Sequence, residues 1–456
     1  MLNTKISALV FYLREAITFS YKRTNGIIEK RLIIKEGAEM ELANKMLHAL
    51  EHEDMALAKK YFDEVVQAGT DEEQYYLAEE LFTLGFLDET EDLYELLLAK
   101  YKDEGELLVR AAEVALEKDD IDSAQDYLEK VNKEDEAYIE SLLVLADLYQ
   151  MQGLFEVSEQ KLLEAKQIAP NEPIIDFALG EYYLSQARFA SAVQSYQTAV
   201  EAGLTIISNG AVSVYERIAE AFAASGAFEE ALSYYERALE DKESIDTLFG
   251  MGLTAYQAKD YTKAIHALEH LREHDPSYTT LYSYLAKSYE ENGEPEKAIA
   301  VLKDGLMQDE FNKEMFLEAG KLAVKLRLPE EAEEFYRQAI VLDEEYSEAI
   351  MQLNKLLIAQ ENYEGVIELV EGLGEEVISE PQIFWDVSVA YQETEQYNKA
   401  KANYELAYSH FTNNPTFLKE YGLFLREEGE HAKSQEVLRN YLELEPEDTE
   451  ILSLFD

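Results

Sequence analysis

The sequence predicts an all-α fold, a right-handed α-solenoid of about twelve stacked helix-turn-helix repeats. Small residues recur at a near-constant step: most steps are 34 residues, and one step of 39 residues separates Ala192 from Ala231. A period of this size is typical of stacked units that bury their core only against neighbouring units. If each repeat is numbered so that the small residue is position 20, the series is Ala58, Thr90, Ala124, Ser158, Ala192, Ala231, Ala264, Ala298, Ala332, Val366, Ala400 and Ser434.

Other positions repeat in the same phase. In most repeats position 8 is glycine or alanine, as at Gly180 and Gly320, and position 24 is tyrosine or leucine, as at Tyr196 and Tyr336. Small residues at positions 8 and 20 allow the two helices of a repeat to approach closely, while the bulky residue at position 24 fills their seam. Glycine at position 15, as at Gly153, supplies the turn between the helices.

The eight prolines test this phase independently. Because proline is tolerated in the first turn of a helix or after its end and is costly inside it, all should lie at helix boundaries. They fall at positions 1, 17 and 32 of the repeat, which are the expected boundaries: Pro170, Pro173, Pro276, Pro295, Pro329, Pro381, Pro415 and Pro446.

The pattern resembles the tetratricopeptide repeat family, most clearly in residues 173–200 and 212–239. The resemblance covers roughly residues 39–446, and in particular the chain resembles uncharacterised cytosolic tetratricopeptide proteins of Bacillus-like bacteria. It implies pairs of antiparallel helices in which the first helix of each repeat lines a concave groove. It also implies a protein that binds other proteins rather than an enzyme.

Three regions follow from the repeat boundaries. Residues 40–446 are expected to form the solenoid, with an irregular joint near residues 201–210 where a longer loop or helix extension would bend it or change its pitch. Residues 447–456 are expected to cap the last repeat. Residues 1–39 lie outside the repeat phase and hold seven Lys/Arg and four Asp/Glu, against 33 and 90 in the remainder. They are interpreted as an N-terminal extension, for which there are two alternatives. The extension is a basic amphipathic anchor, or the start of the chain is mis-annotated and the true start is Met40.

Composition excludes several classes of function. The net charge of −54 argues against a nucleic-acid partner and against binding to an anionic membrane. The chain has no cysteine, which excludes thiolate chemistry and fits a reducing cytoplasm. No apolar run approaches the length of a membrane span. We therefore expect a cytoplasmic protein with no cofactor, no catalytic residue and no metal site. The row His266, His270 and His274 is a weak metal candidate because its i, i+4, i+8 spacing places the imidazoles on one helical face.

The candidate groove residues are found at positions 5 and 9 of the first helices. Position 9 is acidic in five consecutive repeats and basic in three later ones, and position 5 carries aromatic residues that can anchor a partner. This pattern predicts a groove of opposite charge in its two halves, which binds a peptide segment with a basic and an acidic half. The residues are Glu79, Glu113, Asp147, Glu181, Glu220, Lys287, Lys321 and Lys355 at position 9, and Tyr75, Phe177, Phe249 and Trp385 at position 5.

The most direct functional interpretation is a protein–protein interaction scaffold or adaptor. A peptide-responsive regulatory protein and an accessory docking subunit of an enzyme complex remain alternatives. The sequence leaves the identity of the partner and the oligomeric state open.

Overall fold

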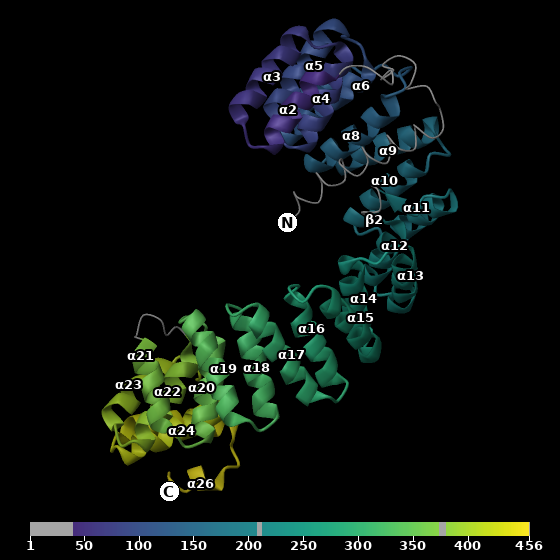
Figure 1. Cartoon of the computed structure of the whole chain (residues 1–456). Coiled ribbons are helices and arrows are strands. Elements are labelled where there is room, and N and C mark those ends of the chain that lie inside the picture. The colour runs from purple at the N-terminus through teal and green to yellow at the C-terminus, as the bar shows by residue number, and fades with distance from the viewer. Residues whose placement is uncertain (1–39, 208–211, 374–379, 456) are drawn as a thin grey trace. The chain divides into compact units, whose positions relative to one another are not determined.

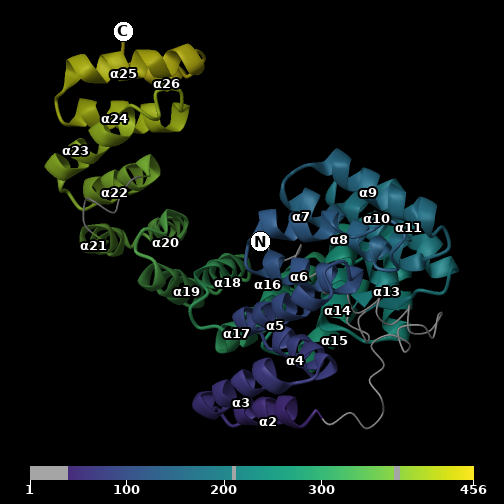
Figure 2. The same cartoon turned by 90° about the horizontal axis from the view of Figure 1, so that it is seen from above.

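The computed structural model describes residues 40–455 except 208–211 and 374–379, and helices follow one another in pairs throughout this part of the chain (Figure 1). The described residues fall into two compact units that divide between Thr254 and Ala255. Within each unit the second helix of a pair also packs against the first helix of the next, as α5 does on α6 and α17 on α18. Figure 2 presents the same pairs from a second direction. The predicted α-solenoid of helix pairs is confirmed.

The first unit holds six complete helix pairs. They are α2 (Glu41–Glu51) with α3 (Met55–Ala68), α4 (Asp71–Thr83) with α5 (Leu87–Lys100), α6 (Gly105–Glu117) with α7 (Ile121–Glu129), α8 (Tyr138–Met151) with α9 (Phe155–Ile168), α10 (Pro173–Ser185) with α11 (Phe189–Glu201), and α12 (Val214–Ala224) with α13 (Phe228–Asp241). The division between the units falls inside the next helix, α14 (Ile245–Gln257).

The second unit continues the series. Its helices are α15 (Tyr261–His274), α16 (Thr280–Glu291) with α17 (Pro295–Gln308), α18 (Lys313–Lys325) with α19 (Pro329–Leu342), α20 (Ser347–Ala359) with α21 (Tyr363–Leu373), α22 (Pro381–Glu393) with α23 (Tyr397–Tyr408), α24 (Pro415–Glu427) with α25 (His431–Leu444), and the short α26 (Thr449–Leu452). Ile451 of α26 is fully buried, and α26 lies within the segment that was expected to cap the last repeat.

The small residues at position 20 form the seam of every pair. All twelve are buried, with exposures between 0 and 2%. Position 8 of the first helix faces position 24 of the second so closely that a methyl group does not fit at some repeats: a Cβ on Gly180 would lie 2.3 Å from the ring of Tyr196, and one on Gly320 would lie 2.4 Å from the ring of Tyr336. The predicted division of small and bulky residues between these positions is therefore how the two helices pack.

The turn between the two helices has the same conformation in all twelve repeats. Position 15 lies in the left-handed region, with φ between 55° and 83°. The N–H of the following residue donates to the carbonyl of position 11, as Leu154 does to Tyr149 and Leu328 to Ala323, and this closes the first helix. Five of these residues are glycine, as predicted, but seven are not: Glu53, Asp119, Ala187, Lys259, Arg327, Glu361 and Glu395. Each of these seven pays the steric cost of a Cβ in this region.

Prolines obey the predicted phase. Pro173, Pro295, Pro329, Pro381 and Pro415 each occupy the first helical position, where the missing N–H would have no intrahelical partner. The other three lie outside the helices, in the turns between repeats.

The connection near residues 201–210 is long, since α11 ends at Glu201 and α12 begins at Val214. It contains two short strands that the sequence did not predict: β1 (Ile206–Ile207) pairs with β2 (Val212–Ser213) in an antiparallel ladder, and residues 208–211 lie outside the described residues. Ile207 and Val212 are buried in the same core cluster as Ala199 of α11 and Ile218 of α12. The core is therefore continuous across the insertion, and the two compact units divide elsewhere, within α14.

The predicted N-terminal extension, residues 1–39, lies outside the described residues, and helix α2 begins at Glu41. Its first turn is held by the next repeat, because the buried carboxylate of Glu73 accepts the N–H groups of Leu42 and Ala43 at 2.8 and 3.0 Å. Among the described residues, no helix is both long enough and apolar enough to cross a bilayer.

The left-handed turns generate a stability prediction in the second unit. Gly293→Ala should destabilise the chain by about 1 kcal/mol, because the new Cβ meets the steric cost of a positive φ. Arg327→Gly at the same position of the next repeat should stabilise it by roughly 0.5–1 kcal/mol, after allowance for the greater freedom of glycine in the unfolded chain. Urea-induced unfolding of the full chain measures both.

Arg327→Ala is the matched control, because it removes the long side chain and keeps a Cβ at positive φ, so it should leave stability nearly unchanged. A stabilisation by Arg327→Ala equal to that by Arg327→Gly would show that the arginine side chain, not the backbone, carries the cost.

Candidate partner-binding surface

The five acidic position-9 residues of the first unit lie on successive first helices: Glu79 on α4, Glu113 on α6, Asp147 on α8, Glu181 on α10 and Glu220 on α12. Hydrogen bonds and ion pairs connect side chains on neighbouring first helices, so these helices present a continuous row of polar groups. For example, the hydroxyl of Tyr75 on α4 donates to Glu106 on α6 at 2.8 Å.

Three carboxylates surround the buried guanidinium of Arg110 on α6. Nη1 lies 2.7 Å from Glu113, Nη2 lies 3.0 Å from Glu140 of α8, and Nε lies 3.9 Å from Glu79 of α4. One arginine thus bridges three consecutive first helices. Since a single positive charge cannot balance three ionised carboxylates, the cluster carries excess negative charge in a largely buried place.

The charge imbalance is resolved partly by protonation. Burial raises the pKa of Glu140 to about 7; Arg110 opposes the shift, while Glu113 and Glu106 add to it. Burial alone would lower the pKa of Arg110, but Glu113 and Glu140 outweigh it, so the guanidinium stays charged.

Asp147 lies between the two arginine-containing parts of the row and is 2% exposed. Burial, and then the nearby charge of Glu181, raises its pKa well above the usual range. A carboxyl group in this environment is expected to be neutral at physiological pH, so Asp147 does not offer a charge to a partner.

A second arginine, Arg217, forms ion pairs with carboxylates on α10 and α12. Arg217 on α12 lies 3.3 Å from Glu181 of α10 and 2.7 Å from Glu220 on its own helix. Glu181 also accepts a hydrogen bond of 2.5 Å from the hydroxyl of Tyr196, and Glu216 accepts one of 2.8 Å from Thr247. Glu181 is the main cause that raises the pKa of Arg217, against the effect of burial.

Five carboxylates lie within 4 Å of Arg110 or Arg217, and three further carboxyl groups lie on the same helices. We call these eight carboxyl groups and two arginines the acidic row. The partly exposed members place carboxyl groups near solvent, with side-chain exposures of 29% for Glu79 and 35% for Glu220. The row is therefore a net-negative surface even where Glu140 and Asp147 are protonated. Its members are Glu79, Glu106, Arg110, Glu113, Glu140, Asp147, Glu181, Glu216, Arg217 and Glu220.

The lysines of the second unit are not a matching basic surface. Lys287 on α16 forms an ion pair of 2.5 Å with Glu318 of α18, and Lys321 pairs with Glu348 of α20. Lys355 is exposed and has no ion pair among the residues that the structure describes. The lysine column is thus largely neutralised by carboxylates of the next repeat, and the opposite polarity predicted from position 9 alone is weaker than expected.

Trp385 lies on α22, the first helix of the repeat that follows the one with Lys355. Its ring is half-buried and makes edge-to-face contacts with Phe411 and Phe417, with centroid separations of 5.2 Å each. Its indole N–H donates to Glu420 of α24 at 2.8 Å. The indole is held in one orientation, with part of its surface still open to solvent.

The structure separates the predicted residues into two groups. Glu79, Glu181, Glu220, Lys287, Lys321, Tyr75, Phe249 and Trp385 are partly exposed, and Lys355 is exposed. Glu113, Asp147 and Phe177 have exposures of 1–2% and pack inside the repeats, so they cannot touch a partner in this conformation. Glu113 is held inside by its ion pair with Arg110, and Phe177 packs against the ring of Tyr196 with a centroid separation of 5.6 Å.

Sequence reasoning missed the arginines and their other carboxylate partners. Arg110 and Arg217 both occupy position 6 of their repeats, and Glu106 and Glu140 occupy position 2. A basic residue at one recurring position inside an acidic run was the available signal. The pairs themselves were not visible, because each joins helices of different repeats.

Two histidines of the weak metal candidate on α15, His270 and His274, lie with Glu243 so that one ligand atom of each is within 4.8 Å of the others, and His266 is not part of this group. The Nε2 atoms of His270 and His274 lie 3.3 Å apart, but the ring of His266 is 6.5 Å from that of His270, centroid to centroid. The intervening Glu269 is already engaged by Arg272 at 2.6 Å and by the hydroxyl of Tyr289 at 2.7 Å.

Comparison with known proteins agrees with this architecture. Two family profiles described as YpiA-like tetratricopeptide repeats match residues 150–204 and, for the C-terminal repeats, residues 381–448. General tetratricopeptide repeat profiles match residues 211–245, 255–316 and 314–346. The TPR repeat-containing protein YpiA of Bacillus subtilis is 41% identical over 381 residues, which cover 84% of this chain and 89% of that protein.

More distant similarities extend over parts of the chain. Tetratricopeptide repeat protein 21B of Mus musculus is 24% identical over 55% of this chain and 21% of its own length. Among solved structures, the C-terminal part of a TPR repeat-containing protein from Cytophaga hutchinsonii covers 61% of this chain and 98% of that chain, with a TM-score of 0.44 and 14% identity. YrrB, described as a TPR protein with an unusual peptide-binding site, covers 41% of this chain and 95% of its own, with a TM-score of 0.35 and 18% identity.

The Glu140 carboxyl generates a prediction of pH-dependent stability. Between its ordinary pKa of 4.5 and its folded pKa of about 7, the folded chain holds a proton that the unfolded chain has released. The stabilisation that the folded chain gains by binding this proton is fully present below pH 4.5 and is lost as the pH rises through 7. Glu140→Gln should therefore stabilise the chain at pH 8 relative to its effect at pH 5, by on the order of 1–3 kcal/mol.

The measurement is urea-induced unfolding of both proteins at pH 5 and pH 8. Glu136→Gln, which removes an exposed carboxyl group nearby in the chain and away from Arg110, is the control. Equal effects of the two substitutions at both pH values would contradict the assignment of excess charge to the Arg110 cluster.

Proposed function

The chain belongs to the YpiA-like family of tetratricopeptide repeat proteins, and we propose that it acts as a non-enzymatic scaffold that binds a partner polypeptide along the first helices of its repeats. Proteins built from these repeats generally mediate protein–protein interactions. The observation that carries the finer proposal is the acidic row, in which carboxyl groups outnumber arginines on successive helices of one unit. We place the activity in the cytoplasm, in keeping with the absence of cysteine from the sequence.

The proposed ligand of the first unit is a basic, extended or helical segment of another protein. Its lysine or arginine side chains would pair with the partly exposed carboxylates of Glu79, Glu181 and Glu220. Exposed charged pairs contribute roughly 0.2–1 kcal/mol each, so they set the orientation and the rate of association more than the affinity. Apolar contacts must supply most of the remaining binding energy.

For the second unit we propose a weaker preference for an acidic segment that carries an apolar side chain. Lys355 is the exposed cation of its column, and Trp385 offers a fixed aromatic surface two helices further along. Because Lys287 and Lys321 are paired with Glu318 and Glu348, a partner would have to compete with carboxylates of the chain itself.

The proposal predicts how charge neutralisation in the acidic row changes peptide binding. The triple substitution Glu79→Gln, Glu181→Gln and Glu220→Gln should weaken binding of a synthetic lysine-rich peptide by on the order of tenfold at low salt. It should also reduce the dependence of that binding on salt concentration, because fewer charges remain to be screened. Glutamine keeps an oxygen that can accept the tyrosine hydroxyl bonds made by Glu79 and Glu181. Because the triple variant also neutralises both ion-pair partners of Arg217, circular dichroism and urea-induced unfolding check that it folds before binding is measured. Fluorescence anisotropy of labelled peptides at several salt concentrations measures both quantities.

A matched control removes the same number of charges from the second helices. Glu95, Glu156 and Glu229 are exposed on α5, α9 and α13, and their replacement by glutamine should change binding little. Equal losses from the two triple variants would mean that only the overall charge attracts the peptide. For the second unit, Lys355→Glu should weaken binding of an acidic peptide and leave binding of the lysine-rich peptide unchanged. The fluorescence of Trp385, the single tryptophan of the sequence, is the readout.

A further inference from the structure

The C-terminal end of helix α2 and its C-cap residue bring together three side chains of types that can bind a metal ion. His48, Glu51 and His52 are spaced i, i+3 and i+4, and one potential ligand atom from each lies within 4.8 Å of the others. All three residues are exposed. The rings of His48 and His52 stack with a centroid separation of 4.3 Å, so the two imidazoles lie side by side.

A backbone contact fixes the chemistry of one imidazole. Nδ1 of His52 lies 2.9 Å from the carbonyl oxygen of His48, a geometry in which the Nδ1–H donates to that carbonyl. The proton is then on Nδ1, and the lone pair on Nε2 is available to a metal ion. Metal-ligating histidines commonly hold their second ring nitrogen in this way, because the bond sets the tautomer and the ring orientation.

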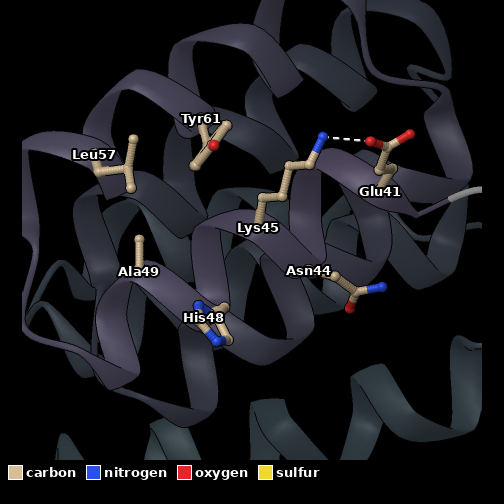
Figure 3. Close-up of a pocket in the computed structure, with 7 residues that line it drawn as sticks. All are labelled: Glu41, Asn44, Lys45, His48, Ala49, Leu57 and Tyr61. Carbon is tan, nitrogen blue, oxygen red and sulfur yellow. Dashed lines mark hydrogen bonds and ion pairs between the residues drawn. The ribbon is translucent and has the colours of Figure 1, made fainter.

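The local electrostatics favour a cation at this end of the helix. The last carbonyl groups of a helix carry partial negative charge, and Glu53 and Asp54 follow directly in the turn to α3. His48 also belongs to a shallow hollow between α2 and α3, lined by Glu41, Asn44, Lys45, His48, Ala49, Leu57 and Tyr61. In Figure 3 the ammonium of Lys45 is directed toward Glu41, with which it forms an ion pair, and away from His48.

The pentapeptide of residues 48–52 occurs again on α15, where its side chains have different neighbours. Residues 48–52 and 266–270 both read His-Ala-Leu-Glu-His. On α15 the two rings are 6.5 Å apart instead of 4.3 Å, and the carboxylate of Glu269 is taken by Arg272 and Tyr289. The contrast shows that the spacing alone does not assemble the donor set.

We propose that His48, Glu51 and His52 form a binding site for a divalent first-row transition-metal ion of the zinc class, a role separate from peptide binding by the acidic row. Two imidazole nitrogens and one carboxylate oxygen are a donor set that Zn²⁺ accepts, with a further coordination position left to water or to a partner's side chain. Bonds of about 2.0–2.1 Å in a tetrahedral site need ligand atoms roughly 3.3 Å apart, which rotation of exposed side chains can provide.

The test is calorimetric titration of the full chain with Zn²⁺ after removal of adventitious metal by a chelator. Excess Mg²⁺ occupies surface carboxylates, and a background with His270→Ala and His274→Ala removes the other close imidazole pair. In this background we expect about one zinc equivalent. His48→Ala or His52→Ala should weaken its binding on the order of tenfold or more, with a smaller loss from Glu51→Gln.

His266→Ala, which removes a histidine from the second copy of the pentapeptide, is the matched control and should leave zinc binding unchanged. Circular dichroism without metal checks that the substitutions on α2 preserve helicity, and zinc-dependent shifts of the imidazole resonances of His48 and His52 identify the ligands. The proposal is overturned if the background binds no zinc. It is overturned equally if the α2 substitutions leave its zinc affinity unchanged while the fold is intact.

Discussion

The rest of the structure depends on how closely the two helices of each repeat approach. The approach is set by buried small residues at position 20 and by glycine or alanine at position 8, which lies against the position-24 side chain. Because interiors are close-packed, this contact fixes the rotation of each first helix about its axis as well as its distance from its partner. A fixed rotation in every repeat is what brings the same positions of successive first helices into line.

That alignment has a consequence for charge. Positions 2, 6 and 9 of neighbouring first helices come within ion-pair distance. Acidic residues at position 9 can therefore form ion pairs with basic residues of neighbouring repeats, and these pairs compete with a partner. In the first unit two arginines at position 6 are shared among several carboxylates, and Glu140 and Asp147 are left in surroundings that favour protonation. In the second unit Glu318 and Glu348 neutralise two of the three lysines. Only the charged side chains that these internal pairs do not neutralise are available to a partner.

The sequence predicted what local chemistry controls and missed what depends on contacts between repeats. The ladder of small residues, the proline positions and the glycines at position 15 each follow from a backbone or packing rule that acts within one repeat. The left-handed turn at Arg327 and at six other non-glycine positions was not marked by its residue type, because the closing hydrogen bonds of the turn overcome the local preference. The two short strands of the insertion were missed since a ladder of two residues has no periodicity to detect. The burial of Glu113 and Phe177 and the bridging role of Arg110 depend on side chains about 30 residues away in the chain, whose register only the folded repeats provide.

The central claim is that the first helices of the first unit, and not the second helices, receive the partner. Hydrogen exchange of the full chain with and without a saturating lysine-rich peptide tests it most directly. The account predicts that added protection concentrates in α4, α6, α8, α10 and α12, the helices that carry the acidic row. Protection concentrated in α5, α7, α9 and α11, or spread evenly over both sets of helices while the peptide is bound, would contradict it.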